Sequence, residues 1–552
     1  NLSLGFFSAL VGSVALSYYN RTMTGYYDTD MFSAMAPMFI LYFLLATIEK
    51  EKDIYSLFAA LAILAYPFLY DSGRSLVYAL GIFFMGYMLV FHRKENFTYQ
   101  SIVLISIALM GIAWYVKLPL ILAGYFFFKQ ERLDQKKLMI FAGLAFIFFL
   151  ITGNVFSLLY AKLMNYTIRG TEQSGLMFFQ VAQTVREAGQ IPFGVMANRI
   201  SGSTLGVLIS LVGYGFLVFR HKPFILALPL IGIGVFSLVG GLRFTVYAVP
   251  VAAISAVYLL QLITRPIEQK KLRLALLTLL TVIFISPNIK HIIEYKVPTV
   301  FNVEEVKVLD RLKDVGSDKD YVIAWWDYGY PLWFYTNKNT LIDGGKHNHD
   351  NYLVSKILTS TSQKEAAYLS RISVETYVSS QYKNVADTLF KNHQEDQVNV
   401  ESFFDELQAD AIELPKATRD VYLYLPLRML SIFPTVKVFS NIDLDTGKKN
   451  SSPFFFESSK LTQDKEIINF GSGVLFDQKT GLLTVGNEKV PVSKIVTTGT
   501  VAHGKVGVNV QTIHPTAPML VLTLQNFVKV LILDKAMYAS PYIQMFFLEN
   551  YD

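Results

Sequence analysis

The chain has 552 residues, of which 52% are hydrophobic and only 17% are charged. This balance excludes a disordered or fibrous protein and argues against a purely soluble globular one. The absence of cysteine excludes thiol catalysis, Cys-ligated zinc and disulfides.

The charge is distributed unevenly along the chain. Residues 1–289 carry 22 Lys/Arg and 12 Asp/Glu, a net charge of +10, whereas residues 290–552 carry 27 and 31, a net charge of −4. The overall balance of +6 therefore belongs to the apolar half and does not indicate a nucleic-acid-binding protein. We expect a multi-span α-helical membrane domain at 1–289, followed by an external α/β domain with a β-rich insert.

Apolar stretches of membrane-spanning length recur in the first half. We place eleven of them, at 4–17, 32–48, 54–70, 75–91, 100–116, 118–128, 138–158, 204–219, 223–240, 244–263 and 274–289. Alternate loops carry 14 Lys/Arg and the opposite short loops carry four, so the positive-inside rule places the first set in the cytoplasm. The second half of the chain and the loops 18–31 and 159–203 then lie outside, and the longer loop shows little helix or strand periodicity.

The chain opens with Asn1-Leu2-Ser3, and no charged segment precedes the apolar stretch that follows. This does not resemble a signal peptide. We expect that the sequence starts inside or just before a transmembrane helix.

The second half predicts alternating strands and helices, which is typical of an α/β layer domain at 290–449. In chain order we expect a helix at 303–315, strands at 320–326 and 340–343, helices from about 350 and through 380–408, a strand at 420–425 and a helix at 426–433. Short alternating strands with Gly and Asn turns predict the β-rich insert at 450–515. Residues 516–552 return to β and then α.

Trp325-Trp326-Asp327 follows the strand at 320–326 and continues as Tyr-Gly-Tyr-Pro. Two indole N–H donors and a carboxylate at a strand end could form a pocket for a small hydroxyl group. The alternative is a buried aromatic corner in which Asp327 caps the next turn.

This string resembles the signature of the catalytic subunit of oligosaccharyltransferases, and the surrounding residues are most similar to the bacterial PglB type. The resemblance covers nearly the whole chain. It rests also on residues 17–23, 25–30, 241–245, 343–347 and 428–432.

The resemblance implies an inverting, metal-dependent enzyme in the bacterial inner membrane, with its active site on the periplasmic side. Such an enzyme moves an oligosaccharide from a polyprenyl pyrophosphate to the Asn of Asn-X-Ser/Thr in acceptor proteins. It also implies a preference for Asp or Glu two residues before that Asn, and action as a single subunit. No nucleic acid is expected as a partner.

The pair Asp28 and Asp30 is a weak signal by itself, and Asp30 is expected to cap the helix that starts at Met31. The resemblance makes Asp28 and Glu187 the catalytic carboxylates and the ligands of Mn²⁺ or Mg²⁺, ions that prefer oxygen ligands. The third acidic ligand is expected in a segment upstream of this sequence. The alternative for Glu187 is a solvated loop carboxylate.

The donor-binding residues that the resemblance implies are Tyr70, Arg243 and His347. Arg243 lies between two apolar spans, where an unpaired cation is costly and a phosphate would be a suitable partner. Tyr70 is followed by Asp-Ser-Gly, which departs from the family's Tyr-Pro-Ser-Ser. His347-X-His349 could also suggest a metal pair, and a solvated loop histidine is the alternative for His349.

The acceptor-binding residues that the resemblance implies are Trp325, Trp326, Asp327, Met429, Ile432 and Arg199. Met429 and Ile432 lie one helical turn apart, and Ile432 would contact the methyl group of the acceptor Thr. Without the resemblance, simple core packing is the better interpretation of this pair. Arg199 would pair with the acidic residue before the acceptor Asn, or else serve as an interfacial anchor.

Two other functions stay open. A polyprenyl-phosphate-dependent sugar transferase that acts on lipid or sugar would not need the Trp-Trp-Asp pocket. A membrane transporter or sensor with an external binding domain predicts polar or broken helices at mid-membrane, and few charges lie inside the spans.

Overall fold

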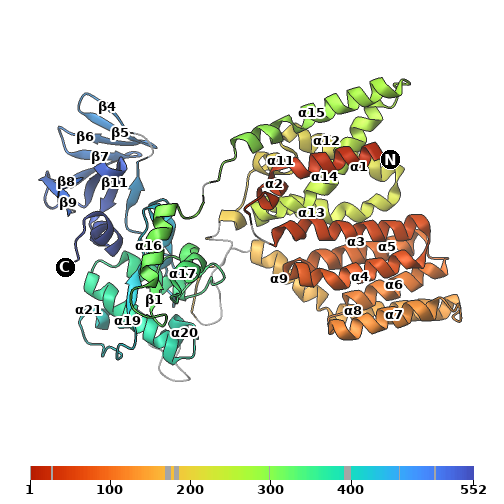
Figure 1. Cartoon of the computed structure of the whole chain (residues 1–552), viewed down its shortest axis with the longest axis horizontal. Helices are drawn as coiled ribbons and strands as arrows, with labels where there is room; N and C mark the ends of the chain where they lie inside the picture. Colours follow the sequence, from red (N-terminus) through yellow and green to blue (C-terminus); the bar gives the residue numbers. More distant parts are fainter. Residues whose placement is uncertain are drawn as a thin grey trace. The chain divides into compact units, whose positions relative to one another are not determined.

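The computed structural model describes residues 2–26, 29–167, 176–179, 184, 186–297, 299–390, 400–458, 461–502 and 505–551. The backbone divides into two compact units (Figure 1). The helical unit comprises residues 1–169 and 181–298, and the α/β unit comprises residues 170–180 and 299–552.

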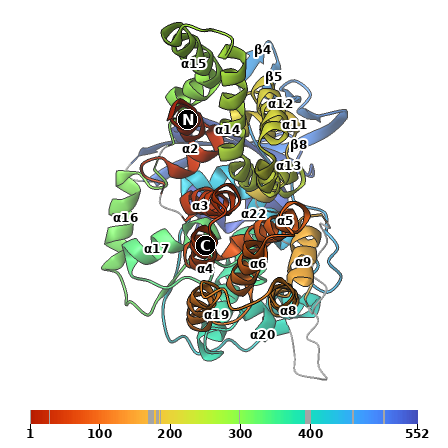
Figure 2. The same cartoon turned by 90° about the vertical axis from the view of Figure 1, so that its right-hand side faces the viewer.

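The described part of the helical unit contains helices and no strands. They are α1 (Leu2–Val14), α2 (Leu16–Thr22), α3 (Asp30–Lys50), α4 (Asp53–Leu69), α5 (Arg74–Phe91), α6 (Asn96–Leu109), α7 (Trp114–Phe128), α8 (Gln135–Thr152), α9 (Val155–Thr167), α11 (Phe193–Ser201), α12 (Thr204–Arg220), α13 (Leu228–Gly240), α14 (Thr245–Thr264) and α15 (Lys270–Glu294). Short 3₁₀ turns lie at η1 (Asp71–Gly73), η2 (Arg186–Ala188), η3 (Lys222–Ala227) and η4 (Leu242–Phe244). Figure 2 shows several of these helices end-on, as a bundle.

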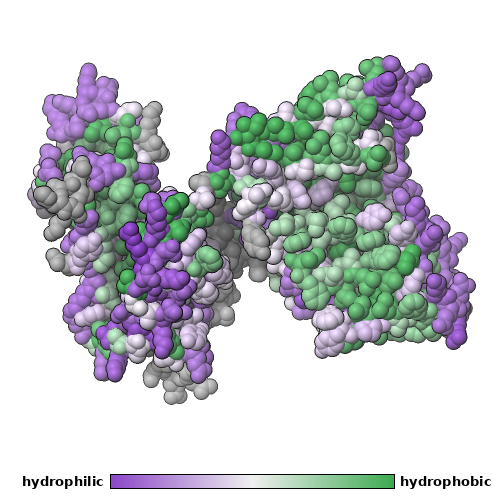
Figure 3. Space-filling view, in the orientation of Figure 1, coloured by the Kyte–Doolittle hydropathy of each residue, from purple (hydrophilic) through white to green (hydrophobic). Residues whose placement is uncertain are grey.

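Six of these helices are long and apolar enough to cross a membrane, and two bent pairs, α1 with α2 and α11 with α12, pass the same test. The shorter apolar helices α4, α6 and α7 have 14 to 17 residues. Large apolar side chains lie exposed on the outer faces of the unit, and Figure 3 shows them as a broad hydrophobic band. Such a surface needs a lipid bilayer to cover it. The expectation of about eleven spans stays a prediction.

The loop expected at 159–203 differs from its prediction at both ends. Helix α9 runs to Thr167, and α11 begins at Phe193 after Pro192, whose fixed φ suits the entry to a helix. Part of this loop, residues 176–179, belongs to the α/β unit, where the Met177 N–H donates to the Leu444 carbonyl over 2.6 Å. Phe178 and Phe179 are buried in the core of that unit.

The α/β unit begins with helices around a short parallel strand pair. Its elements are α16 (Val303–Lys313), β1 (Tyr321–Ile323), η5 (Trp326–Tyr328), α17 (Gly329–Thr336), α18 (Asp350–Thr359), α19 (Gln363–Ser379), α20 (Val385–Phe390), α21 (Val400–Gln408), β2 (Val421–Leu423), η6 (Leu427–Ser431) and α22 (Phe433–Ser440). Strands β1 and β2 pair in parallel from Tyr321↔Val421 to Ile323↔Leu423. The strand expected at 340–343 is absent, since only an isolated bridge joins Tyr321 to Asn339.

The rest of the unit is a mainly antiparallel sheet. Its strands are β3 (Phe455–Glu457), β4 (Thr462–Asp464), β5 (Ile467–Gly471), β6 (Val474–Asp477), β7 (Leu482–Val485), β8 (Glu488–Ala502), β9 (Lys505–Thr512), β10 (Met519–Leu524) and β11 (Lys529–Asp534). The described order is β3-β11-β10-β8-β7-β6-β5-β4, with β9 on β8, and β10 runs parallel to β8. Helix α23 (Lys535–Ala539) and a π-helical turn at Tyr542–Phe547 follow.

Candidate functional site

A pocket of about 220 Å³ in the helical unit brings together three of the predicted site residues, Tyr70, Glu187 and Arg243. They come from three separate places in the sequence: the end of α4, η2 and η4. The remaining lining residues are Arg21, Asp30, Ser33, Ser72, Gly73, Ser75, Leu76, Ile233, Phe244 and Tyr247. Two cations and two carboxylates thus face one small cavity.

Arg21 connects the two carboxylates of this pocket. Its guanidinium, which is almost completely buried, forms ion pairs with Asp30 and with Glu187, the latter over 3.1 Å. The prediction that Asp30 caps a helix is wrong: the N-cap of α3 is Thr29, and Asp30 is the first helical residue, with its carboxylate paired to Arg21. A buried Arg requires an acidic partner, and this demand outweighs capping.

Gly241 explains how Glu187 reaches the pocket. Its φ is +98°, and a Cβ atom at this position would lie 2.2 Å from the Glu187 carbonyl oxygen and 2.7 Å from the backbone of Ala188. Only glycine allows this close approach at this φ. The backbone of η2 therefore packs directly on the turn that carries Arg243.

The predicted donor residues have neighbours that sequence reasoning missed. Tyr247 on α14 interacts with the side chains of Tyr70 and Ser33. Arg21 lies inside the segment 17–23 that carries the resemblance. A cation near the membrane boundary is costly without a partner, and this could have identified Arg21 as a site residue. Nothing in the sequence marked Tyr247.

Arg199 lies on α11, where its backbone carbonyl accepts a hydrogen bond from the Ser17 hydroxyl over 2.8 Å. Its charge interacts with those of Arg21 and Glu187. The Nε atoms of both Arg199 and Arg243 are buried and have no hydrogen-bond partner in the described structure. Each guanidinium group therefore has a buried N–H that is not satisfied within the described structure.

Asp28 lies outside the described residues, so Glu187 is the predicted metal ligand that can be located. Its carboxylate is half exposed and offers the hard oxygen donors that Mn²⁺ and Mg²⁺ prefer. It therefore fits such an ion, with Arg21 as a competing partner. A separate group of possible ligands among the described residues, Glu51, His92 and Glu95, lies at helix ends and not in this pocket.

In the α/β unit, the two other predicted clusters follow the carboxyl ends of β1 and β2. Because these strands are parallel neighbours, η5 and η6 emerge at the same edge. Trp325 is fully buried and packs edge-on against Phe439, with ring centroids 4.9 Å apart. Trp326 is partly buried, and Asp327 is exposed.

Asp327 has no cationic partner among the described residues. Its side chain is exposed, yet the surrounding protein partly desolvates the carboxylate and raises its pKa, an effect that its own backbone N–H opposes. The next turn packs closely: a Cβ on Gly329 would lie 2.5 Å from the Cα of Asp343. Gly329 thus fixes the Asp343–His347 loop beside the tryptophan motif.

Met429 is completely buried, whereas Ile432 is partly buried at the end of η6. Core packing therefore accounts for Met429. Ile432 retains exposed surface that another molecule could contact.

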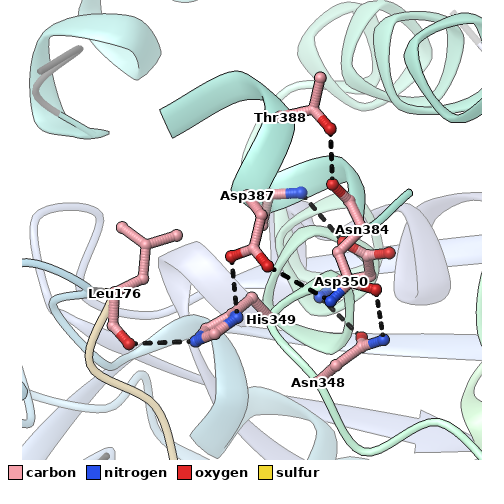
Figure 4. A network of polar contacts seen from close by, with 8 residues as sticks. Leu176, Asn348, His349, Asp350, Asn384, Asp387 and Thr388 are labelled. Carbon is pink, nitrogen blue, oxygen red and sulfur yellow. Dashed lines mark hydrogen bonds and ion pairs between the residues drawn. The ribbon is translucent and has the colours of Figure 1, made fainter. Parts of the chain in front are cut away.

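His347 and His349 have different surroundings. The His347 ring lies 6.5 Å from the ring of Trp326 and 5.7 Å from that of Phe178. The interpretation of His349 as a solvated loop histidine is wrong, because its ring is buried. Its Nε2–H donates to the Leu176 carbonyl oxygen over 3.1 Å, and its Nδ1 pairs with Asp387 over 3.2 Å (Figure 4). His349 thereby helps to hold the segment 176–179.

Asp350 extends this network. It accepts a hydrogen bond from the Ala386 N–H over 2.9 Å, and burial raises its pKa to about 6. The neighbouring Asn348 donates from Nδ2 to Asn384 over 3.1 Å. These contacts are structural, since they connect α18 to α20.

Three family models match the chain. Residues 2–292 match the N-terminal model of oligosaccharyl transferase STT3, residues 318–446 match the STT3/PglB/AglB core domain, and residues 454–533 match the STT3/PglB C-terminal beta-barrel domain. The predicted residues of the helical unit lie in the first match, and the tryptophan motif lies in the second.

Similar proteins are found along the full length. An undecaprenyl-diphosphooligosaccharide–protein glycotransferase of Campylobacter jejuni is 38% identical over 575 residues, which cover 100% of this chain and 79% of that protein. The C-terminal domain of C. jejuni PglB is 32% identical, covering 45% of this chain and 92% of that chain, with a TM-score of 0.40. The archaeal oligosaccharyltransferase AglB from Archaeoglobus fulgidus, solved with an inhibitory peptide and a dolichol-phosphate, is 15% identical over 69% of this chain and 56% of that one, with a TM-score of 0.48.

Proposed function

Because the chain belongs to the STT3/PglB family of oligosaccharyltransferases, we propose that it transfers an oligosaccharide from a polyprenyl pyrophosphate to the Asn of Asn-X-Ser/Thr. One observation carries the proposal furthest. A single pocket in the helical unit is lined by Tyr70, Glu187 and Arg243, which are distant in sequence and which the family resemblance assigns to metal and donor binding.

The donor pyrophosphate would bind at Arg243 and Tyr70 in the helical unit, and the family resemblance adds His347 to the proposed donor-binding residues. Arg guanidinium groups bind phosphate oxygens with charge-assisted, often bidentate hydrogen bonds. The position of Arg243 on the wall of the pocket, beside Tyr70, supports this role. Arg21, which is tied to Asp30 and Glu187, would add positive charge where the leaving pyrophosphate develops negative charge.

Glu187, together with Asp28, would hold Mn²⁺ or Mg²⁺, which when bound supplies Lewis-acid stabilisation of the departing pyrophosphate. The same carboxylates would accept hydrogen bonds from the acceptor amide, whose lone pair is delocalised and poorly nucleophilic. Arg21 holds Glu187 in the pocket. Attack on the face opposite the pyrophosphate would invert the anomeric carbon.

The acceptor would bind in the α/β unit. Asp327 would accept the hydrogen bond from the Ser or Thr hydroxyl, Trp326 would flank it, and the exposed part of Ile432 would contact the Thr methyl. The buried Trp325 and Met429 would support this corner from below. Arg199 would pair with an acidic residue two positions before the Asn.

The apolar helices make this a membrane protein. The bacterial inner membrane, a periplasmic active site and action without other subunits are part of the proposal. The asymmetric distribution of Lys and Arg between the loops supports the orientation.

A transfer assay tests this function. The protein in membranes with Mn²⁺ and a pool of lipid-linked glycans should add a glycan mass to an Asp-X-Asn-X-Thr peptide. It should not modify peptides with Gln for Asn or Val for Thr. Modification of the Gln peptide, or of lipid and sugar only, would contradict the assignment.

Asp327→Ala should weaken peptide binding by about 1.5–3 kcal/mol, because it removes a charged hydrogen-bond acceptor. Donor affinity should not change. Fluorescence anisotropy of a labelled peptide measures the loss, and Asp310→Ala, an exposed acid on α16, is the matched control. Equal peptide affinity in both variants would remove Asp327 from the acceptor site.

A further inference from the structure

An open cavity of about 950 Å³ lies in the helical unit, far in sequence from the pocket of Arg21 and Glu187. It is formed by the last turns of α12 and α14 and the first turns of α15. These ends belong to the loops that the positive-inside rule places in the cytoplasm. The cavity is therefore on the membrane face opposite the proposed active site.

Four permanent cations line this cavity: Arg220, Arg265, Lys270 and Arg273. His221 lines it too, and its ring packs edge-on against Tyr258. No Asp or Glu contributes to the wall. Within the part of the chain that the structure describes, these four side chains make no ion pair and no hydrogen bond. A concave surface with one sign of charge attracts the opposite ion.

An open, mainly apolar face of α15 continues from the cavity, and Lys271 lies at its start. The cavity and this face share Leu274, and the face runs on past Leu279 to Val282. These three side chains are 51%, 55% and 52% exposed. Eight residues of helix span roughly 12 Å, which suits the upper part of an acyl chain.

Basic residues in the loops of a membrane protein often only set its orientation in the membrane. We therefore compare the loop at α15 with another loop that carries the same number of basic residues. The loop 129–137 also carries four Lys or Arg, but Glu131 and Asp134 lie among them, and Asp134 pairs with Lys137 over 3.7 Å. The loop at α15 also holds one acid, Glu268, but it does not line the cavity. The cavity differs from the loop 129–137 in having cations without ion pairs among the described residues, a concave shape and an adjoining apolar face of α15.

We propose that this cavity binds an anionic phospholipid, with its phosphate against Arg220, Arg265, Lys270 and Arg273 and one acyl chain along Leu274, Leu279 and Val282. A basic pocket between transmembrane helices at the cytoplasmic surface is suited to such a headgroup. The adjoining apolar surface of α15 favours a lipid over a free phosphate.

Native mass spectrometry of the protein in detergent tests the proposal with three probes: phosphatidylglycerol, phosphatidylcholine and inorganic phosphate. We expect retained phosphatidylglycerol and at least tenfold weaker retention of phosphatidylcholine. Phosphate alone should not displace the bound lipid. Equal retention of the two lipids would overturn the proposal, and displacement by millimolar phosphate would show a site for the free anion instead.

The double variant Arg265→Ala/Arg273→Ala should reduce retention of phosphatidylglycerol at least tenfold. The control variant Lys129→Ala/Arg132→Ala removes the same charge from the matched loop and should retain the lipid. Leu279→Gln should weaken phosphatidylglycerol binding without removing a cation. Unchanged retention in the Arg265/Arg273 variant, with a thermal midpoint equal to that of the control, would overturn the assignment.

Discussion

The two proposed binding regions treat their carboxylates in opposite ways. In the helical unit, Asp30 and Glu187 share one buried cation, Arg21. In the α/β unit, Asp327 has no cationic partner among the described residues, and partial desolvation raises its pKa. The first arrangement fixes the position of the carboxylates, so that Glu187 could hold a metal ion in the pocket. The second leaves the Asp327 carboxylate partly desolvated, so that a hydrogen bond from a hydroxyl group stabilises its ionised form.

Removal of Arg21 should have the largest effect, because it leaves two carboxylates unpaired in a mostly buried site. Arg21→Ala should lower the free energy of unfolding by about 2–3 kcal/mol, less than the roughly 3–5 kcal/mol expected for breaking a fully buried pair, because Glu187 is half exposed. Glycan transfer should fall more than 100-fold. Thermal unfolding in detergent and the transfer assay measure the two losses.

Arg74→Ala is the control for this change. Arg74 pairs with Asp71 over 2.6 Å, but both side chains are more than half exposed. Loss of this exposed ion pair should lower the free energy of unfolding by less than about 1 kcal/mol. A similar destabilisation by the two variants would show that Arg21 is not the electrostatic centre of the pocket.

A pair of glycine substitutions should separate the two regions. Gly241→Ala would push the Glu187 backbone away, whereas Gly329→Ala would push against Asp343. Each substitution should lower the free energy of unfolding by about 1–3 kcal/mol, because the neighbouring backbone must move. Gly241→Ala should lower transfer at least tenfold with peptide affinity unchanged, and Gly329→Ala should lower peptide affinity.

The controls are Gly232→Ala and Gly507→Ala, one in each unit, because a Cβ at either position meets nothing within 4 Å. Both variants should keep glycan transfer and peptide affinity within about twofold of the wild-type values. Loss of peptide affinity in Gly241→Ala would contradict the assignment of peptide binding to the α/β unit alone.

The smallest expected effect is a pH dependence. A hydroxyl donates best to ionised Asp327, so peptide affinity should fall on acidification as the carboxylate becomes protonated. Since its pKa is raised, this fall should begin at a higher pH than an ordinary Asp would show. The total loss should be about tenfold.

Anisotropy titrations with an Ala-X-Asn-X-Thr peptide, which lacks other titrating side chains, measure this dependence. Asp327→Asn should bind weakly and without the pH dependence. A wild-type affinity that stays constant down to pH 4 would contradict the role of the ionised carboxylate.

The sequence was informative where a residue pattern has a direct physical meaning. Apolar length predicted the helices of the first half, and period-two alternation predicted the strands around Leu482. The resemblance placed Tyr70, Glu187 and Arg243 in one function, and they line one pocket. Their individual roles stay predictions.

What the sequence did not reveal depends on contacts between distant segments. The partner of Asp30 is Arg21, and the burial of His349 depends on Leu176 and Asp387. Local patterns favoured a cap and a solvated loop, because they contain no information about these partners. The missing strand at 340–343 has the same cause, since only one bridge to Tyr321 forms.

The parallel pairing of β1 with β2 has a consequence for the order of folding. Tyr321 pairs with Val421, so 100 residues of chain must be closed into a loop before η5 and η6 can lie at one edge. Loop closure costs entropy that is recovered only when the distant strand arrives, which makes such pairings slow. During synthesis, the tryptophan motif therefore leaves the ribosome well before the strand that completes its surroundings. The acceptor corner is expected to be among the last parts of the protein to mature.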